Sequence, residues 1–435
     1  MLGRRPGVVS YAPPVEDARP DTGAWFDEAR FGMFVHWDHA SQQGLEVSWP
    51  LVGGVFALPF CQSVSVEQYH SSAATFDPVS WDPEALARLA RRAGMGYAVL
   101  TTKHHSGYAM WPTGCSDFSV QHSPGGQDIV GGFVDAMRRE GLRVGLYFSL
   151  SDWHHADYPP FTESDKPYVI GVSPPRPEAE RWERYLEYMR AQITELLTGY
   201  GRIDMLWFDG GWERPDWGAD VLEATIRRLQ PDILINDRLP GVGDFATPEQ
   251  FVPDSAPGGR WETCLTMNHS WGWCPGDTDY KSARQLVHTL CQVAGKGGNL
   301  LLNISPRGDG SLPEAQVERL EAVASWMDRN GEAIRATGAG LEAPQFYGPS
   351  TRRGDSIYLH LLMRPYDGAD VRNVPVRRVR SVREVASGRP LEFHTHTGVI
   401  EGLMPDPRGT LTVGIPGDVV GDLATIVAID FEPAP

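Results

Sequence analysis

The sequence predicts an α/β fold: a TIM-like (β/α) barrel catalytic domain followed by a small all-β sandwich. From about residue 21 to residue 340, strand-like apolar runs alternate with amphipathic helical stretches. After Ala343 the pattern changes to short β-type runs separated by Gly, Pro and Asp turns. Seven or eight β/α units suit a barrel. A doubly wound open sheet is less consistent, because no G-x-G-x-x-G follows any strand.

Three regions are expected along the chain. Residues 1–20 are Pro-rich and polar and are predicted to form a surface arm, residues 21–340 the barrel, and residues 341–435 the sandwich. Barrel strands are expected at Phe31–Trp37, Tyr97–Lys103, Arg143–Leu150, Asp204–Asp209, Ile233–Asp237, Arg260–Met267 and Asn299–Ser305. Helices are expected from Asp82-Pro83 and at Gln127–Glu140, Glu178–Leu197, Asp216–Leu229, Ser282–Val293 and Glu314–Met327. Sandwich strands are expected at Ser356–Met363, Val374–Val382, Thr410–Ile415 and Leu423–Phe431.

Composition narrows the classes of partner. The net charge of −17 argues against nucleic acid and against an anionic membrane surface. No apolar run of about 18 residues predicts a membrane span. The five cysteines form no C-x-x-C pair, so neither a disulfide framework nor a zinc ribbon is indicated. The N-terminus lacks the apolar segment of a signal peptide, which predicts a cytoplasmic protein, or a secreted or periplasmic one if a leader has been removed.

The chain is organised around the run Met205–Gly211, in which apolar residues end in one carboxylate and two glycines. This pattern predicts a buried strand with Asp209 at its carboxyl end, where ligands bind in parallel α/β folds. Side chains alternate along a strand, so Trp207 is expected on the same face as Asp209. Other predicted strands also end in polar or aromatic residues, which predicts a convergent site for a small, uncharged, hydroxyl-rich ligand.

Two other chemistries, metal binding and a nucleophilic serine, are less consistent with the sequence. His36, His39, His104 and His105 are candidate metal ligands. However, the adjacent His104 and His105 are expected to point to opposite sides of an extended chain, which favours carboxylate chemistry without a metal or cofactor. A nucleophilic serine is not indicated, because no G-x-S-x-G motif occurs. The His-Thr-His at 394–396 is expected on the surface of the β-domain.

Nine blocks in order resemble the α-L-fucosidases of glycoside hydrolase family 29. They are FGMFVHW, TTKHHSGYAMWPT, GLYFSLSDWH, MLWFDGG, INDR, TPEQF, WETCLTMNHSWGW, GKGGNLLLNISPRGDG and ASWMDRNGEAI, between about Trp25 and Thr337. The resemblance implies a barrel with a C-terminal β-sandwich, exo-hydrolysis of terminal α-L-fucose with net retention, and no cofactor.

The resemblance also implies roles for individual residues. Asp209 matches the family's nucleophile. The residues that match or are expected to make substrate contacts are His36, Trp49, His104, His105, Tyr147, Trp207, Arg238 and Trp271. The chain departs from the family pattern where Asp38 replaces a glycine, Ser106 replaces an aspartate and Ser48-Trp49 replaces a frequent Glu-Trp pair, with Glu46 nearby.

Retaining hydrolysis needs a second carboxyl group, the acid/base, about 5–5.5 Å from the nucleophile. Two glutamates are candidates. Glu249 lies in a loop rich in Gly and Pro that could reach over the mouth, and is preferred. Glu262 lies within a predicted strand, where a structural ion pair is the simpler explanation, and is the second choice.

The expected partner is a small carbohydrate, a fucosylated glycan, and the sequence is compatible with a homo-oligomer. Two alternative functions remain at this point. One is a catalytically impaired fucose-binding protein, which would not hydrolyse an aryl fucoside. The other is a metal-dependent barrel hydrolase, which would be sensitive to chelators.

Overall fold

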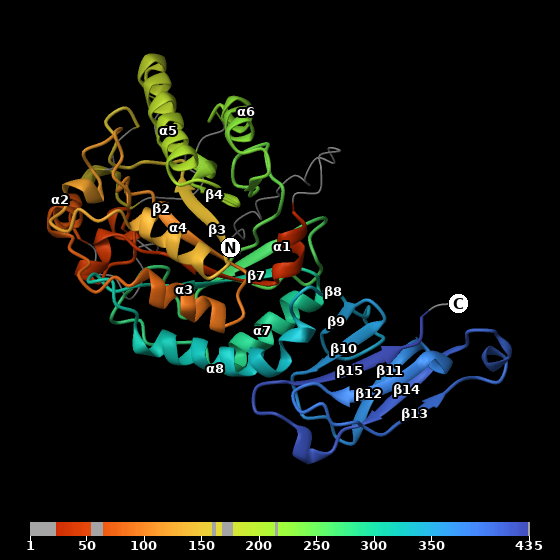
Figure 1. Cartoon of the computed structure of the whole chain (residues 1–435). Helices are drawn as coiled ribbons and strands as arrows, with labels where there is room; N and C mark the ends of the chain where they lie inside the picture. Colours follow the sequence, from red (N-terminus) through yellow and green to blue (C-terminus); the bar gives the residue numbers. More distant parts are fainter. Residues whose placement is uncertain (1–22, 54–63, 159–161, 168–176, 214–215, 434–435) are drawn as a thin grey trace, which may run out of the picture.

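The computed structural model describes residues 23–53, 64–158, 162–167, 177–213 and 216–433 (Figure 1). The predicted N-terminal arm, residues 1–20, lies outside the described residues. Within them, a seven-stranded parallel sheet has the order β5-β4-β3-β2-β1-β7-β6. Its strands are β1 (Phe31–Val35), β2 (Tyr97–Lys103), β3 (Arg143–Ser149), β4 (Met205–Asp209), β5 (Leu234–Ile235), β6 (Glu262–Leu265) and β7 (Asn299–Ile304).

The barrel closes through an irregular segment, residues 244–250, that lies between β5 and β6. Isolated parallel bridges join Asn236 to Phe245 on one side, and Ala246 to Trp261 on the other. The Ala246 N–H donates to the Arg260 carbonyl at 2.9 Å, and the Glu262 N–H donates back to the Ala246 carbonyl at 2.9 Å. We call residues 244–250 the closing segment. The predicted (β/α) barrel is confirmed, although the sequence did not indicate this segment as a strand.

Helices surround the sheet. They are α1 (Ala24–Ala29), α2 (Val66–Ser71), α3 (Pro83–Arg92), α4 (Ile129–Arg139), α5 (Ala179–Gly199), α6 (Ala219–Leu229), α7 (Ala283–Gly295) and α8 (Glu314–Asn330). Six of them, α3 to α8, lie where the hydrophobic pattern predicts them; α1 and α2 were not expected. The Asp82 side chain accepts the Ala85 N–H and Pro83 occupies the first turn of α3, as expected. Ser282 and Gln285 form a capping box at the start of α7. No helix of the described residues has the length and apolar character needed to cross a bilayer.

Alternation along β4 separates two cores. Leu206 and Phe208 pack in the layer between the strands and the helices, whereas Met205 and Trp207 face the barrel interior. At the amino end of the barrel, Phe26 of α1 fills the interior, with its ring 4.9 Å from that of Phe245. The register of β3 against β4 sets Tyr147 opposite Trp207 and Ser149 opposite Asp209. The polar strand ends therefore lie at the other, carboxyl end of a filled barrel.

Glu262 is a fully buried carboxyl group inside this barrel. It accepts hydrogen bonds from the Trp207 indole N–H at 2.8 Å and from the Tyr97 hydroxyl. Burial raises the pKa of Glu262 to about 7, although the two hydrogen bonds oppose the shift. Glu262 stands at the start of β6, and both of its oxygens bond side chains of the barrel interior.

The C-terminal domain consists of two antiparallel sheets. One has the order β12-β15-β10-β9-β8 and the other β11-β14-β13. Their strands are β8 (Gly338–Ala339), β9 (Ser350–Arg353), β10 (Ser356–Leu361), β11 (Gly368–Pro375), β12 (Val379–Glu384), β13 (Phe393–His396), β14 (Arg408–Gly414) and β15 (Thr425–Phe431). The predicted boundary between the two domains at residue 340 stays a prediction. The strand β8, which lies just before it, already belongs to the antiparallel sheet.

The domain packs against α7 and α8 (Figure 1). The Trp326 indole N–H donates to the Ala424 carbonyl at 3.0 Å, and His288 bonds the Leu423 carbonyl at 2.7 Å. These contacts lie on the outer side of the barrel helices and leave the carboxyl ends of the strands uncovered.

One predicted strand of this domain is wrong. The run Val374–Val382 is not a single strand, because β11 ends at Pro375 and β12 begins at Val379 in the other sheet. A short 3-10 turn, Val376–Arg378, joins them, following a proline that has no N–H to continue a ladder. The prediction that His394 and His396 are exposed is confirmed, as all of β13 is exposed.

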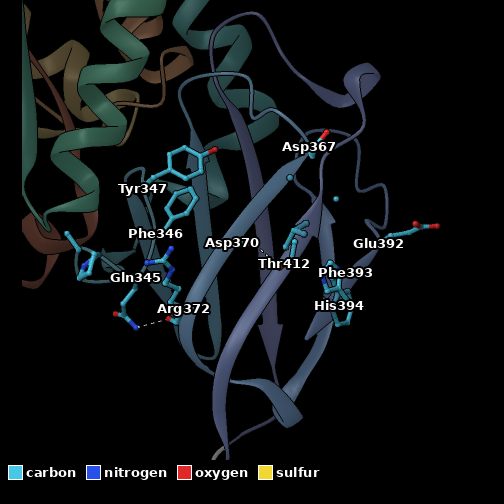
Figure 2. Close-up of a pocket in the computed structure, with 15 residues that line it drawn as sticks. Gln345, Phe346, Tyr347, Asp367, Asp370, Arg372, Glu392, Phe393, His394 and Thr412 are labelled. Atoms are coloured by element: carbon cyan, nitrogen blue, oxygen red, sulfur yellow. Dashed lines mark hydrogen bonds between the residues drawn. The ribbon is translucent and has the colours of Figure 1, made fainter. Parts of the chain in front are cut away.

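A groove of about 1110 Å³ opens on the three-stranded sheet of this domain (Figure 2). Tyr347 and Phe393, which are 55% and 38% exposed, contribute its aromatic rings. Its charged side chains, among them Asp370 and Glu392, are exposed and spread along the sheet. It therefore lacks the buried, convergent polar groups that mark a catalytic site.

Replacing Glu262 by Gln should change how stability depends on pH. The protonated Glu262 stabilises the fold fully below its unfolded pKa of 4.5, and this contribution is lost as the pH rises through about 7. The shift corresponds to about 3 kcal/mol. Gln does not titrate, so the variant lacks this pH dependence. Between pH 4.5 and about 7, the free energy of unfolding of the native protein should therefore fall by about that amount relative to that of Glu262→Gln. Urea unfolding at several pH values measures it, and a pH-independent difference would contradict the assignment.

Candidate active site

Asp209 lies at the carboxyl end of β4, at the mouth of the barrel. Its Oδ2 accepts the Tyr147 hydroxyl at 2.9 Å, and its Oδ1 accepts an Arg238 N–H at 3.0 Å. Burial alone would raise the pKa of this carboxyl, but the Arg238 charge and the hydrogen bonds from Tyr147 and Arg238 outweigh burial and lower the pKa. Asp209 is therefore an anion at neutral pH.

The backbone around Asp209 is held rigidly. The Asn236 carboxamide accepts the Phe208 N–H at 2.7 Å and donates to the Phe208 carbonyl at 2.9 Å, so a side chain continues the ladder where β5 has ended. Both following glycines are required: Gly210 has φ of +76°, and a Cβ on Gly211 would lie 2.2 Å from the Arg238 carbonyl oxygen. The sequence Asp-Gly-Gly therefore fixes the carboxylate at the strand end.

Arg238 joins Asp209 to Glu249. A second guanidinium nitrogen donates to Glu249 Oε2 at 2.7 Å, and the guanidinium lies 4.6 Å from the centre of the Trp207 ring. Glu249 belongs to the closing segment, and its side chain is 38% exposed, compared with 8% for Arg238. Two carboxylates from different elements thus face one cation, and one of them is open to solvent.

The two acid/base candidates are separated in space. Glu249 lies at the mouth beside Asp209, whereas Glu262 bonds the Trp207 indole and has no exposed surface. Burial raises the pKa of Glu262, but both of its carboxyl oxygens are bonded to side chains of the barrel interior, Trp207 and Tyr97. Of the two candidates, Glu249 is therefore the one with an exposed side chain at the mouth.

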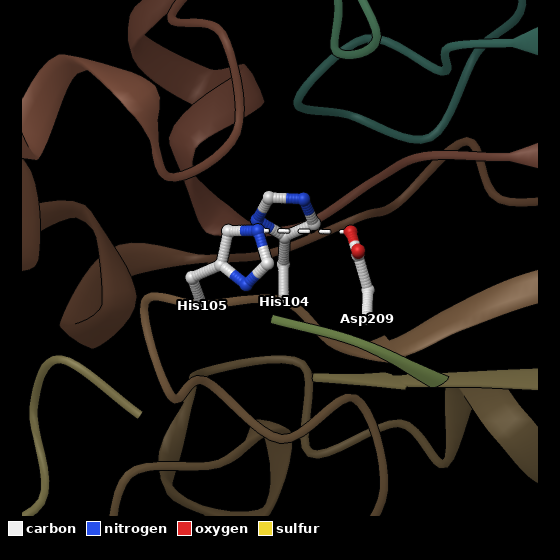
Figure 3. Close-up of side chains that lie close together, drawn as sticks. All are labelled: His104, His105 and Asp209. Carbon is white, nitrogen blue, oxygen red and sulfur yellow. Dashed lines mark ion pairs between the residues drawn. The ribbon is translucent and has the colours of Figure 1, made fainter. Parts of the chain in front are cut away.

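His104 and His105 lie on the same side of the mouth, which corrects the expectation that they point apart (Figure 3). Strand alternation does not apply to them, because β2 ends at Lys103 and the chain then turns. Their ring centres are 4.1 Å apart, and His105 Nε2 is 3.7 Å from Asp209 Oδ2.

These three residues also satisfy the distances of a metal cluster. One ligand atom from each of His104, His105 and Asp209 lies within 4.8 Å of the others. However, the Arg238 guanidinium contacts the same carboxylate at 3.0 Å, and a fixed positive charge there opposes a bound cation. The residues fit a neutral ligand better than a metal ion.

The site histidines are neutral. Burial lowers the pKa of His36 to about 3 and that of His105 to about 4, and burial also holds the pKa of His104 well below its ordinary value. A neutral imidazole offers one donor and one acceptor, which suits sugar hydroxyls.

Aromatic rings line the mouth. Tyr147 and Trp207 stack with ring centres 5.6 Å apart, and Trp271 lies 4.7 Å from His36. Trp49 lies 5.5 Å from His105. All eight expected substrate contacts are therefore brought together around Asp209; in chain order they are His36, Trp49, His104, His105, Tyr147, Trp207, Arg238 and Trp271.

Several supporting residues were missed. Glu46 accepts the backbone N–H groups of Trp271 and Gly272 at 2.7 and 2.8 Å, and so holds Trp271 in place. Asn303, at the end of β7, bonds His36, and Trp212 lies 5.5 Å from His105. The strand-end pattern does point to Asn303, at the end of the last predicted strand, whereas no local pattern marks Glu46, whose partners are 225 and 226 residues away.

The departures from the family pattern lie in contact with one another. Asp38 Oδ2 accepts the Ser106 hydroxyl at 3.4 Å, and the Ser106 N–H donates to the Ser48 hydroxyl at 2.7 Å. Burial raises the pKa of Asp38 to about 6. Three positions at which the chain departs from the family pattern are thus linked to one another by hydrogen bonds.

Comparison with known proteins agrees with this geometry. A sequence model of the α-L-fucosidases matches residues 8–332. Tissue α-L-fucosidase of Bos taurus is 33% identical over 354 residues, covering 75% of this chain and 72% of that protein. The tissue enzyme of Rattus norvegicus is 30% identical over 436 residues, covering 93% and 90%.

Solved structures extend the likeness to the whole fold. α-L-Fucosidase isoenzyme 1 from Paenibacillus thiaminolyticus superposes with a TM-score of 0.81 at 35% identity, covering 95% of this chain and 99% of that one. The Thermotoga maritima α-fucosidase gives 0.76 at 29% identity, covering 94% and 96%. The chain is therefore a glycoside hydrolase and belongs to the α-L-fucosidases of glycoside hydrolase family 29.

Proposed function

We propose that the protein is a retaining exo-α-L-fucosidase that uses Asp209 as nucleophile and Glu249 as acid/base. The observation that carries this proposal is the Arg238 guanidinium, which holds both carboxylates at the barrel mouth, at 3.0 and 2.7 Å. A site that only bound sugar would have no need for this pair. The retaining mechanism requires it.

In the first step, an Asp209 oxygen forms a bond to C1 of the fucose as the bond from C1 to the leaving oxygen breaks. Glu249 gives its proton to that oxygen. In the second step, Glu249 takes a proton from water, the water oxygen bonds to C1, and the β-fucosyl ester to Asp209 breaks. Asp209 suits the first role because it is ionised and rigidly placed.

Glu249 suits a role that alternates between proton donor and acceptor. To donate, Glu249 must carry a proton and leave its contact with Arg238. Its exposed position on the closing segment gives it room to do so. A family structure from Bacteroides thetaiotaomicron is described as a trapped covalent intermediate with 2-fluoro-fucosyl fluoride, and the Thermotoga maritima structure contains a mechanism-based inhibitor. A covalent step in this chain would agree with both.

The substrate would be a terminal, uncharged fucose. The neutral His36, His104 and His105 would bond its three hydroxyls, and Phe34, whose ring lies 5.1 Å from Trp207, would contact its methyl group with Trp207 and Trp271.

The first prediction is stereochemical. Hydrolysis of an aryl α-L-fucoside should first release α-L-fucose, because two displacements at C1 restore the configuration. NMR of the reaction in its first minutes would detect the anomer. Initial β-fucose would show an inverting enzyme, and no hydrolysis would favour a binding protein.

Asp209→Ala should slow turnover of every substrate by about 10⁴-fold or more, since no attacking group remains. Added azide should restore part of the rate and give the β-fucosyl azide, by entering the vacated space. Steady-state rates and product analysis measure this. A variant that retains most of its activity would remove Asp209 from the mechanism.

Glu249→Ala should discriminate between leaving groups. Cleavage of fucosyl-oligosaccharides should fall by about 10²–10⁴-fold, whereas the glycosylation step with a nitrophenyl fucoside, whose leaving group hardly needs a proton, should change little. Azide should then give the α-azide, through attack on the ester. The exposed Asp254→Ala serves as control and should match the native protein. If Glu262→Ala shows this pattern and Glu249→Ala does not, the acid is Glu262.

A further inference from the structure

Each of the three site histidines has its Nδ1 bonded to a buried polar side chain away from the sugar. His36 Nδ1 is 2.7 Å from Asn303 Oδ1, His104 Nδ1 is 2.6 Å from Ser48 Oγ, and His105 Nδ1 is 2.7 Å from Ser149 Oγ. The partner at Nδ1 decides which ring nitrogen carries the proton and thus what Nε2 offers to a ligand.

His36 is fixed by Asn303. The Asn303 Nδ2 donates to the Trp271 carbonyl at 2.7 Å, which sets the orientation of the amide and turns its oxygen toward His36. An amide oxygen can only accept, so His36 Nδ1 carries the proton. His36 Nε2 is therefore a hydrogen-bond acceptor.

His105 is fixed by a chain of two bonds. The Ser149 hydroxyl donates its single proton to the Ser151 carbonyl at 2.7 Å, so Ser149 Oγ can only accept from His105. His105 Nδ1 is then the protonated nitrogen and Nε2 is an acceptor. That Nε2 is buried without a hydrogen-bond partner among the described residues, 3.7 Å from the Asp209 oxygen.

His104 has the opposite arrangement. Ser48 Oγ already accepts the Ser106 N–H at 2.7 Å, and Ser48 is fully buried. The Tyr69 hydroxyl, which donates its own proton to the Val47 carbonyl, also lies near Ser48, but the side-chain hydrogen bond of normal geometry that Ser48 Oγ makes is to His104 Nδ1, at 2.6 Å. We assign the proton of the Ser48 hydroxyl to that bond. His104 Nδ1 therefore accepts, and His104 Nε2 carries the proton and is a donor.

We propose that Asn303, Ser48 and Ser149 are specificity-determining positioning residues, which lock the histidine tautomers so that His36 and His105 accept from, and His104 donates to, the hydroxyls of the sugar. The identity of the ligand rests on the proposed function, whereas the tautomers are a property of the free protein. Two ligand hydroxyls must then donate a proton and one must accept. His105 Nε2 and Asp209 Oδ2 face each other, and both can only accept a hydrogen bond. One of the donating hydroxyls of the sugar supplies the proton between them.

The tautomers can be measured directly by NMR of protein with ¹⁵N-labelled histidine rings, in the absence of sugar. The chain has 13 histidines, and His36→Asn, His104→Asn and His105→Asn each identify one signal by its loss. We expect a proton on Nδ1 of His36 and His105 and on Nε2 of His104. A different set of protonated nitrogens would overturn the proposal, whether or not the enzyme is a fucosidase.

The effect on recognition is tested with L-fucose and its three monodeoxy analogues as competitive inhibitors. Ser48→Ala and Ser149→Ala should each weaken L-fucose by about 10-fold, the typical value of one hydrogen bond. Each substitution should disturb the contact to one sugar hydroxyl, so the deoxy analogue that lacks this hydroxyl should bind the variant and the native enzyme equally well. That analogue should be a different one for Ser48→Ala and for Ser149→Ala. An equal loss for all the analogues would indicate a merely structural role and would overturn the proposal.

The exposed Ser71→Ala provides the matched control and should bind all four sugars like the native enzyme. If Ser48→Ala does not fold, the Ser149→Ala series and the NMR of the native chain still decide. Loss of hydrolysis with the expected tautomers would count against the proposed function and leave the tautomer assignment in place.

Discussion

The guanidinium of Arg238 is the interaction on which the site depends. It contacts Asp209 at the end of β4, the Thr247 side chain and Glu249 of the closing segment, and the face of Trp207. A buried cation is costly unless it is paired, and here two carboxylates and an aromatic face provide the pairing. Trp207 is itself anchored by Glu262. The barrel interior, the strand that carries Asp209 and the closing segment are thus joined through one side chain.

The sequence was sufficient for the barrel, for the position of Asp209 and for most of the mouth, because these follow from local patterns. Strand alternation placed Trp207 with Asp209, and a proline after an aspartate marked the start of α3. The features that the sequence did not predict correctly share one cause. Closure by residues 244–250, the facing of His104 and His105, and the Glu46 contact to Trp271 depend on where the chain turns or on partners distant in sequence. The strand predicted across Pro375 failed because hydrophobic pattern alone does not show when a chain changes sheets.

The site recognises its ligand with uncharged groups around a single charged core. The histidines are neutral because they are buried, and the tryptophans add apolar surface, which suits a sugar that carries hydroxyls and a methyl group but no charge. Charge is concentrated on Asp209, Arg238 and Glu249, where we propose that the bond is broken. Ser48 and Asp38, two of the departures from the family pattern, lie behind the mouth: Ser48 bonds His104, and Asp38 accepts from Ser106.

The closing segment is the irregular part of the barrel wall. Regular strands such as β3 and β4 carry a continuous ladder, but residues 244–250 have only isolated bridges, and the fully described stretch from Phe251 to Trp261 contains no helix to cover them. Backbone hydrogen bonds still tie the segment to both neighbours, through Asp244 to Ile235 on one side and through Gln250 to Cys264 on the other. The two carboxylates therefore stand on different kinds of backbone: Asp209 ends a regular strand, whereas Glu249 belongs to an irregular segment that no helix covers.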